Sequence, residues 1–493
     1  MKNILTVIVA ASAFFNINAE TLTLTPGSIS AGIAADAAPA ELIIKGEIDI
    51  RDFDYIRDNF WRTLRTLDLS EARIAAYEGE PTLIGVSKSE ADVLPDGALM
   101  LGSLTEVTLP ATLKAIGDGA LASTAIKEIV IPATVEKIGV SAFANCNSLE
   151  SVAFPASVNA LGANAFADCG ALKSADISAA ALEEVPTGAF ARCAALAEAS
   201  IPSVAEIGAS AFAGCKALTA VEFPKSLKKI DKRAFYGSGL AAADLAPCPT
   251  LGEIGAWSFA ACGDLASATF PESLKELGTG AFYSSSALTL GELPPVARLS
   301  DLSLAAIGGT ADASLTLPEG VEIGDYAMSG WKGIQLLTLP ETTGRIGTEA
   351  MAGWTDLATI DGLNAVEVPL LGEEVWKGID PSEVLLRVYD TKADDFKAAD
   401  QWKDFRFDIV TGVDDAAAVA PGAWFEGMTL NVEAPAEIAA MEIYDVEGRR
   451  YSFPTVASES TRRAVDTSAW GVRVLLVRVQ LADGSAAALK LAR

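Results

Sequence analysis

The sequence predicts a solenoid of stacked β-strand coils, capped at both ends and followed by a small antiparallel β-sandwich. Residues 126–146 and 149–169 are two copies of one pattern: L/I-x-x-V/I-x-I/F-P, then V-x-x-I/L-G, then A-F-A-x-C. This pattern recurs from about residue 94 to residue 378. Near the C-terminus, short apolar runs alternate with turn residues, as in antiparallel strands.

Composition and charge narrow the function before any motif is considered. The chain has 493 residues, is 50% hydrophobic and carries a formal net charge of −28, from 37 basic and 65 acidic side chains. Such an acidic surface repels phosphate backbones, so we expect no nucleic-acid partner. The chain contains no histidine, and therefore lacks the most common general base and zinc ligand. We expect a protein that is not an enzyme and has no cofactor.

Residues 1–19 have the pattern of a signal peptide. Lys2 supplies the positive end, Ile4–Phe15 is an apolar run too short to span a bilayer, and Ala19 ends a small-residue cleavage site. No later stretch is long and apolar enough for a transmembrane helix. We expect export to the cell surface or the extracellular space, rather than to the periplasm.

Residues 20–93 read as an N-terminal cap with a first repeat. Leu42–Ile44 and Leu64–Leu69 have strand-like apolar spacing, and Ile48–Phe60 between them has an apolar face at helical spacing. A solenoid's first coil exposes its apolar side unless an atypical element covers it, which explains a cap at this position.

The repeats predict 13 coils. In each coil we define the anchor as the residue at the F of the A-F pair. Successive anchors lie 22–24 residues apart, except for one interval of 46 that a degenerate coil around Leu302–Ala305 fills. This period is in the leucine-rich-repeat range, so the predicted solenoid is mainly β with short helical turns. We expect the repeat glycines to mark sharp turns at the end of the second run. The other anchors are Leu99, Leu121, Phe143, Phe166, Phe190, Phe212, Phe235, Phe259, Phe282, Met328, Met351 and Val375.

The chain after the repeats divides into a closing helix and a last domain. Phe396, Ala399 and Trp402 have helical spacing, which predicts an amphipathic helix over the last coil and a solenoid domain spanning residues 94–410. Short apolar runs in the remainder predict a β-sandwich over residues 413–493.

The repeat pattern resembles the BspA-like leucine-rich repeats of surface and secreted proteins of anaerobic Gram-negative bacteria. The last domain, with MEIYDVEGRR, VDTSAWGV and VRVQLADGSAAALKLAR, is similar to type IX secretion sorting domains. It departs from that family's G-V-Y-x-V-x-V at Gly471–Val479, so a plain β-sandwich is the alternative. The first resemblance implies adhesion, and the second implies contact of residues 413–493 with outer-membrane secretion machinery.

Five of the six cysteines fill one position of the repeat, which Thr124, Ser238 and Ser285 fill in other coils. A position that accepts cysteine, serine or threonine is typical of a small buried site, so we expect free thiols. Disulfides between neighbouring coils of an exported protein are one alternative, and a metal or redox site is another. The five are Cys146, Cys169, Cys193, Cys215 and Cys262.

Trp331 and Trp354 occupy the same repeat position as the cysteines, one coil apart, and Trp376 lies in the following coil. One interpretation is that larger side chains fill a wider core where the solenoid ends. The other is an aromatic platform that binds a sugar or a protein partner. These three tryptophans are the candidate partner-binding residues.

The sequence therefore predicts a non-catalytic, exported repeat protein that binds a host or bacterial surface protein or a glycan. The alternative is a structural or assembly component of the cell envelope, in which the solenoid is a spacer and residues 413–493 are an anchor.

Overall fold

The computed structural model describes two compact units. One holds the solenoid, to Asp408, and the other holds the residues from Ile409 onward together with 389–391. The predicted signal peptide lies outside the described residues, except for Ala19. The described residues are 19–82, 86–310, 312–411, 422–426, 429–434, 437–445, 449–451, 461–468, 470, 474–481 and 486–492.

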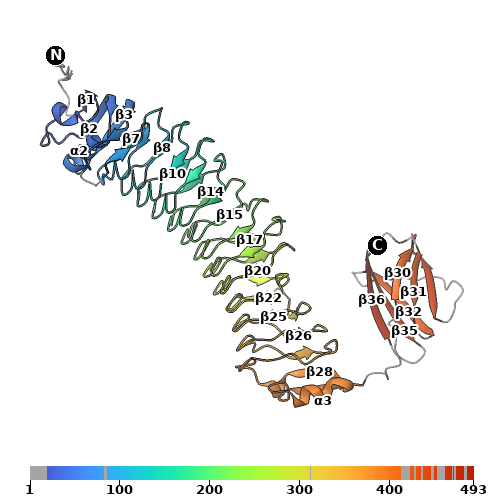
Figure 1. Ribbon diagram of the computed structural model, residues 1–493. Helices are drawn as coiled ribbons and strands as arrows, with labels where there is room; N and C mark the ends of the chain where they lie inside the picture. The colour runs from blue at the N-terminus through green and yellow to red at the C-terminus, as the bar shows by residue number, and fades with distance from the viewer. Residues whose placement is uncertain are drawn as a thin grey trace. The chain divides into compact units, whose positions relative to one another are not determined.

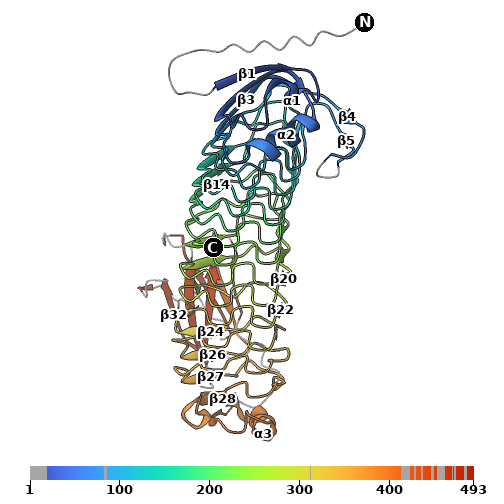
Figure 2. The same ribbon diagram turned by 90° about the vertical axis from the view of Figure 1, so that its left-hand side faces the viewer.

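A parallel sheet and a helix begin the solenoid (Figure 1). The sheet order is β1 (Ala19–Leu24), β2 (Glu41–Ile48), β3 (Thr66–Ile74) and β7 (Glu106–Thr108). Helix α2 (Ile50–Phe60) follows β2, after the short α1 (Ile29–Gly32), and Asp49 forms a capping box at its start. The predicted strand–helix–strand order is confirmed. An antiparallel hairpin, β4 (Tyr77–Glu78) and β5 (Lys88–Ser89), projects from this cap (Figure 2).

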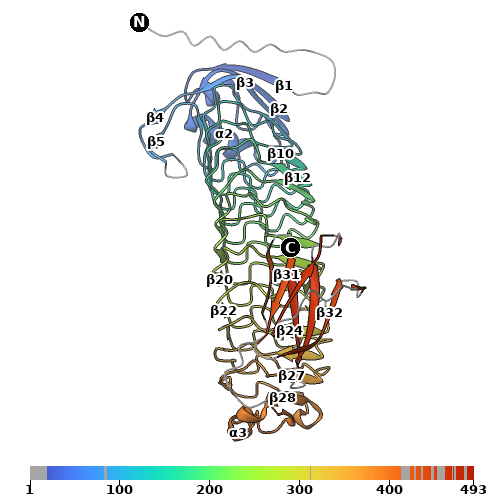
Figure 3. The ribbon, with the colours of Figure 1, turned by 90° about the vertical axis from the view of Figure 1, so that its right-hand side faces the viewer.

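The coils stack through two series of short parallel strands on opposite sides of the solenoid (Figures 2 and 3). The first series, which we call the strand face, comes from the L-x-x-V-x-I run. It consists of β7, β10 (Ser151–Ala153), β12 (Ser174–Asp176), β14 (Glu198–Ser200), β17 (Ala242–Asp244), β19 (Ser267–Thr269), β21 (Thr289–Leu290), β23 (Gly309–Thr310), β24 (Ser314–Thr316), β26 (Leu336–Thr338), β27 (Thr359–Asp361) and β28 (Leu385–Tyr389). Strand β29 (Arg406–Val410), which follows the repeats, pairs with β28 at the edge of the last sheet.

The second series comes from the V-x-x-I run. It consists of β6 (Val93–Leu94), β8 (Ala115–Ile116), β9 (Lys137–Ile138), β11 (Ala160–Leu161), β13 (Glu184–Val185), β15 (Glu206–Ile207), β16 (Lys229–Ile230), β18 (Glu253–Ile254), β20 (Glu276–Leu277), β22 (Arg298–Leu299) and β25 (Glu322–Ile323).

The A-F-x-x-C runs form a third side, which we call the turn face. Its residues make turns rather than helices, and the anchors carry a third series of hydrogen bonds. Phe143 N donates to Ala165 O at 2.8 Å, and equivalent bonds join successive coils along the solenoid. Each coil therefore bonds to its neighbours on three sides.

The anchors form the centre of the core. All seven anchor phenylalanines are fully buried, and their rings stack coil upon coil at centroid distances of 4.9–5.5 Å. Leu304, in the degenerate coil, is also buried, and its N donates to Ala327 O. The predicted repeat, including its degenerate coil, is confirmed.

The repeat glycines have a different role from the predicted one. Gly117, Gly139 and Gly162 do not have positive φ, so they do not mark turns that require glycine. A Cβ at Gly162 would lie 2.3 Å from Gly139 C and from Val140 N of the preceding coil. These glycines let the backbones of adjacent coils approach closely.

A short helix and two strands close the solenoid. Helix α3 (Asp390–Ala398) lies between β28 and β29, and a 3₁₀ turn, η1 (Pro381–Glu383), precedes β28. The helix is shorter than predicted, because Trp402 falls in the turn after it. The Trp402 indole is buried and donates to Pro369 O at 3.0 Å, so it still covers the last coil.

The described part of the C-terminal unit has two antiparallel sheets, which confirms a β-sandwich. One contains β30 (Gly422–Glu426), β31 (Thr429–Glu433) and β34 (Arg462–Asp466). The other contains β33 (Arg450–Tyr451), β32 (Ile438–Asp445), β35 (Val474–Leu481) and β36 (Ala486–Ala492). Buried side chains from both sheets, including Val432, Val465, Ile443 and Val477, form its core.

Candidate partner-binding surfaces

The repeat position that holds cysteine, which we call the donor position, is defined by a hydrogen bond as well as by size. In eight coils, its side chain donates to the backbone carbonyl of the anchor in the preceding coil. Cys193 Sγ, for example, lies 3.1 Å from Phe166 O. Thiol, hydroxyl and indole groups all serve as the donor. The eight residues are Cys146, Cys169, Cys193, Cys215, Cys262, Ser285, Trp331 and Trp354.

The three candidate tryptophans are buried. Trp331 and Trp354 are 0% and 1% exposed, stack at 5.8 Å, and donate to Leu304 O and Met328 O at 2.7 and 2.8 Å. Trp376 is 4% exposed and packs against Trp402. The aromatic platform at these residues stays a prediction that this packing does not favour, because a ligand needs an exposed ring.

All six cysteines are free thiols and are buried, in agreement with the predicted free thiols. Burial raises the pKa of Cys215 to about 12. The pKa of Cys146 is also raised, first by its hydrogen bond with Cys169 and then by burial. Only the protonated thiol can donate the hydrogen bond to the anchor carbonyl. The buried environment therefore favours the protonation state that stabilises the repeat.

We expect the folded protein to be inert to thiol reagents at pH 8. The reactive species is the thiolate, and both burial and raised pKa values suppress it. Titration with a chromogenic disulfide reagent should detect no fast-reacting thiol in the native state, and six thiols in urea without reductant. Fewer than six in urea would indicate disulfides, and rapid reaction of the native protein would contradict the burial.

Substitutions of Cys193 should separate the contribution of its hydrogen bond to stability from the contribution of its side-chain volume. We expect Cys193→Ala to lower the free energy of unfolding by about 1–2 kcal/mol, because Phe166 O loses its partner and a small cavity forms. Cys193→Ser should cost less, because the hydroxyl keeps a donor, as Ser285 does in its own coil. Urea unfolding measures both changes. A serine variant less stable than the alanine variant would indicate a position selected by packing alone.

The strand face exposes small, hydroxyl and acidic side chains. In its regular strands the middle residue points inward, and the two beside it are wholly or partly exposed. From β12 to β27, no basic residue flanks the buried one in these described strands. The acidic members are Asp176, Glu198, Asp244 and Asp361. This face therefore offers a partner small, polar and acidic side chains along its length.

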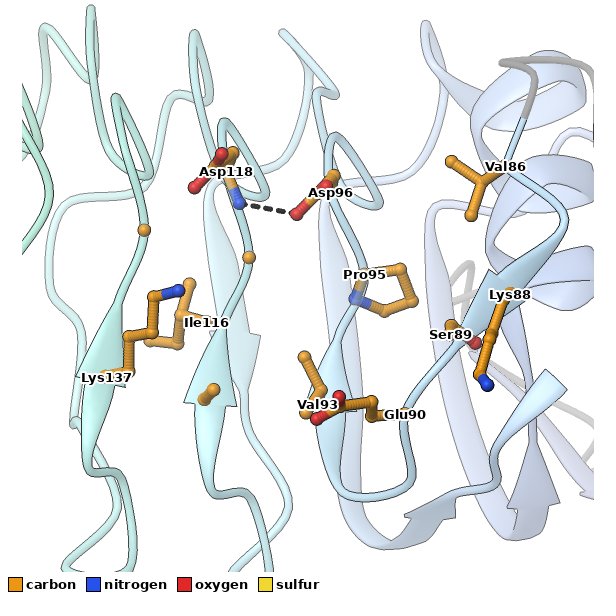
Figure 4. Close-up of a pocket in the computed structure, with 13 residues that line it drawn as sticks. Val86, Lys88, Ser89, Glu90, Val93, Pro95, Asp96, Ile116, Asp118 and Lys137 are labelled. Atoms are coloured by element: carbon orange, nitrogen blue, oxygen red, sulfur yellow. Dashed lines mark hydrogen bonds between the residues drawn. The ribbon is translucent and has the colours of Figure 1, made fainter.

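A cleft of about 340 Å³ lies between the β4–β5 hairpin and the first coils (Figure 4). Lys88 and Glu90 line it from the hairpin side, and Lys137 lines it from β9. Asp96 and Asp118 at its other end bind the backbone of the next coil: Asp96 Oδ1 accepts from Asp118 N at 2.7 Å, and Asp118 Oδ1 accepts from Val140 N at 2.8 Å. These two carboxylates therefore serve the stacking of coils.

Two general features of the described residues bear on the type of site. Among them, no three side chains of His, Cys, Asp or Glu are grouped so that they could hold a metal ion. Within the same residues, no helix has both the length and the apolar character needed to cross a membrane.

Comparison with known proteins finds a family model that matches part of the repeats. Residues 94–197 and 183–302 match the BspA type leucine rich repeat region, in six copies. No curated protein matches the chain.

Among solved structures, the chain is similar to a leucine-rich repeat protein from Bacteroides ovatus, with 18% identity, a TM-score of 0.56, and coverage of 83% of this chain and 100% of that one. It is also similar to a leucine rich cell surface protein from Faecalibacterium prausnitzii, with 20% identity, a TM-score of 0.38, and coverage of 62% and 84%.

The Bacteroides likeness shows the fold, and the family match adds the type of repeat. The solenoid therefore has the leucine-rich-repeat fold, and residues 94–302 are similar to the BspA type of that repeat.

Proposed function

We propose that the chain is a non-catalytic protein of the cell surface or extracellular space that binds a protein or glycan partner through its solenoid. One observation carries this proposal: the coils bury their apolar residues inward and leave parallel columns of exposed side chains along the strand face and the turn face. Such extended surfaces are how repeat proteins bind partners. The signal-peptide pattern of residues 1–19 and the leucine rich cell surface protein among similar structures agree with export.

A role in the cell envelope is the second candidate, because the C-terminal β-sandwich is a separate compact unit that could act as an anchor. In this case the solenoid is a spacer, and residues 413–493 contact the outer membrane or its secretion machinery.

Protease treatment of intact producing cells tests the location. We expect added protease to remove the solenoid without lysis. The purified chain should then bind a member of an array of extracellular-matrix proteins and glycans. A chain that is protected on intact cells, together with a leaky envelope in the deletion strain and no array binding, would favour the envelope role instead.

A further inference from the structure

Three aromatic side chains reach the surface of the turn face in three successive coils. Tyr236 is 43% exposed and Tyr283 is 36% exposed, and Trp257 in the coil between them is half-buried. The core beneath is already filled, because the stacked anchors Phe235 and Phe282 are fully buried. These three rings are therefore not needed to fill the interior.

Tyr236 and Tyr283 occupy a position that is usually alanine. Each directly follows its anchor, and the coil between them has the buried Ala260 there. Two coil spacings separate the tyrosines by roughly 10 Å. The small side chain of Ala260 therefore lies between the two tyrosines in this column. Alanine fills the same position at 122, 144, 167, 191, 213, 305 and 352.

Trp257 has a left-handed backbone, with a φ of 60°. The residue two places before the anchor has the same conformation in other coils, where it is Gly188, Gly280, Ser210 or Tyr326, for example. This conformation favours glycine, because a side chain there costs free energy. The backbone is therefore a general property of the repeat, and what distinguishes Trp257 is its large aromatic side chain.

The Trp257 ring is held in place by its neighbours. A Cβ at Gly280 would lie 2.7 Å from Trp257 Cε3, so the indole lies against a backbone that has no side chain. The ring also meets Tyr283 edge to face, with 5.5 Å between centroids and an angle of 73°. A surface ring that is fixed in this way loses little entropy when a ligand binds.

We propose that Tyr236, Trp257 and Tyr283 form a binding site for a neutral polysaccharide, an inference that rests on the proposed binding function. The C–H faces of pyranose rings pack on aromatic rings, while tyrosine hydroxyls and the indole N–H bond to sugar hydroxyls. The three rings come from successive coils, with the two tyrosines in one column and Trp257 beside it, so the surface is long enough for several sugar units of a polymer. The net charge of −28 disfavours sulfated or sialylated chains.

Affinity electrophoresis of the full chain tests this site, in gels containing yeast mannan, dextran, laminarin or a galactan. We expect retardation by at least one of these, and it should persist in high salt because stacking is not screened. Tyr236→Ala, Trp257→Ala and Tyr283→Ala should each weaken binding by about 10-fold or more. Tyr326→Ala is the matched control, because Tyr326 is 37% exposed on the same face, two coils beyond Tyr283.

Circular dichroism melting should show that all four variants fold. No retardation of the wild-type chain by any of the four polymers overturns the site, as does equal retardation of the wild type and the three variants. A fifth gel contains dextran sulfate, and retardation in that gel alone also overturns the site. A chain that binds a matrix protein but none of these polymers refutes this site and leaves the proposed binding function intact.

Discussion

Phe212→Ala should lower the free energy of unfolding by about 3–5 kcal/mol, the usual cost of removing a buried aromatic ring. Phe212 is fully buried in the middle of the phenylalanine stack, with ring centroids 5.5 Å from Phe190 and 5.4 Å from Phe235. Its removal opens a cavity between two coils that the rigid ladders on three sides cannot close.

Phe212→Leu is the matched control, because Leu121 and Leu304 hold the anchor position in other coils. We expect it to cost about 1 kcal/mol, since most of the volume is kept. Urea unfolding followed by circular dichroism measures both variants. Because coils contact only their neighbours, the alanine variant should also broaden the transition as the two halves uncouple. An alanine variant as stable as the leucine variant would show that the stack contributes little.

Gly162→Ala should lower the free energy of unfolding by about 2–3 kcal/mol, as overpacking does in a rigid core. The new methyl group would lie 2.3 Å from backbone atoms of Gly139 and Val140, and a backbone cannot rotate away as a side chain can. The coils must move apart, which lengthens the hydrogen bond of 2.8 Å from Gly162 N to Ile138 O.

Gly263→Ala provides the comparison for Gly162. No atom lies within 4 Å of a Cβ at Gly263, and its φ is not positive. We expect this variant to match the wild type or gain a few tenths of a kcal/mol from a less flexible unfolded chain. Thermal and urea unfolding should therefore show that Gly162→Ala is destabilised and Gly263→Ala is not. Equal stabilities would mean that adjacent coils separate at little cost.

Periodicity was sufficient to predict the fold. The anchors recur every 22–24 residues, and the same spacing places them in one buried stack. The glycines show where this reasoning failed. Gly162 recurs at a fixed place in the repeat, as a turn residue would. Its role, however, depends on how closely the backbone of the preceding coil approaches it. The sequence of a single repeat contains no information about the distance between two coils.

The donor position shows a second case in which the sizes of the side chains gave an incomplete prediction. Cysteine, serine and threonine there suggested a small site, a rule that Trp331 and Trp354 do not obey. Hydrogen-bond donation to the anchor carbonyl of the preceding coil explains the cysteines, Ser285 and the two tryptophans. Thr124 instead bonds to Leu121 O of its own coil, and Ser238 Oγ pairs with Cys262 Sγ of the following coil at 3.4 Å. Ile307, which has no donor, occupies this position in the degenerate coil.

The surface positions of Tyr236, Trp257 and Tyr283 were not predicted from the sequence, because only the tryptophans of the last coils were considered. The signal appears when the coils are aligned. Tyr236 and Tyr283 stand where most coils have alanine, and Trp257 stands where most other coils have glycine or a smaller side chain. Alignment of the coils could therefore have singled out these positions. The seating of the Trp257 ring on Gly280 could not be predicted, because it depends on the left-handed backbone of both residues.

The hydrogen bonds of each coil to its two neighbours have a mechanical consequence. Tension along the solenoid axis should peel off one coil at a time, since in the described part of the solenoid no hydrogen bond joins coils that are not adjacent. Each released coil of about 23 residues adds roughly 80 Å of extended chain. Pulling a single molecule from its ends should give a sawtooth of evenly spaced steps, so the solenoid would absorb load by lengthening before the whole array gives way.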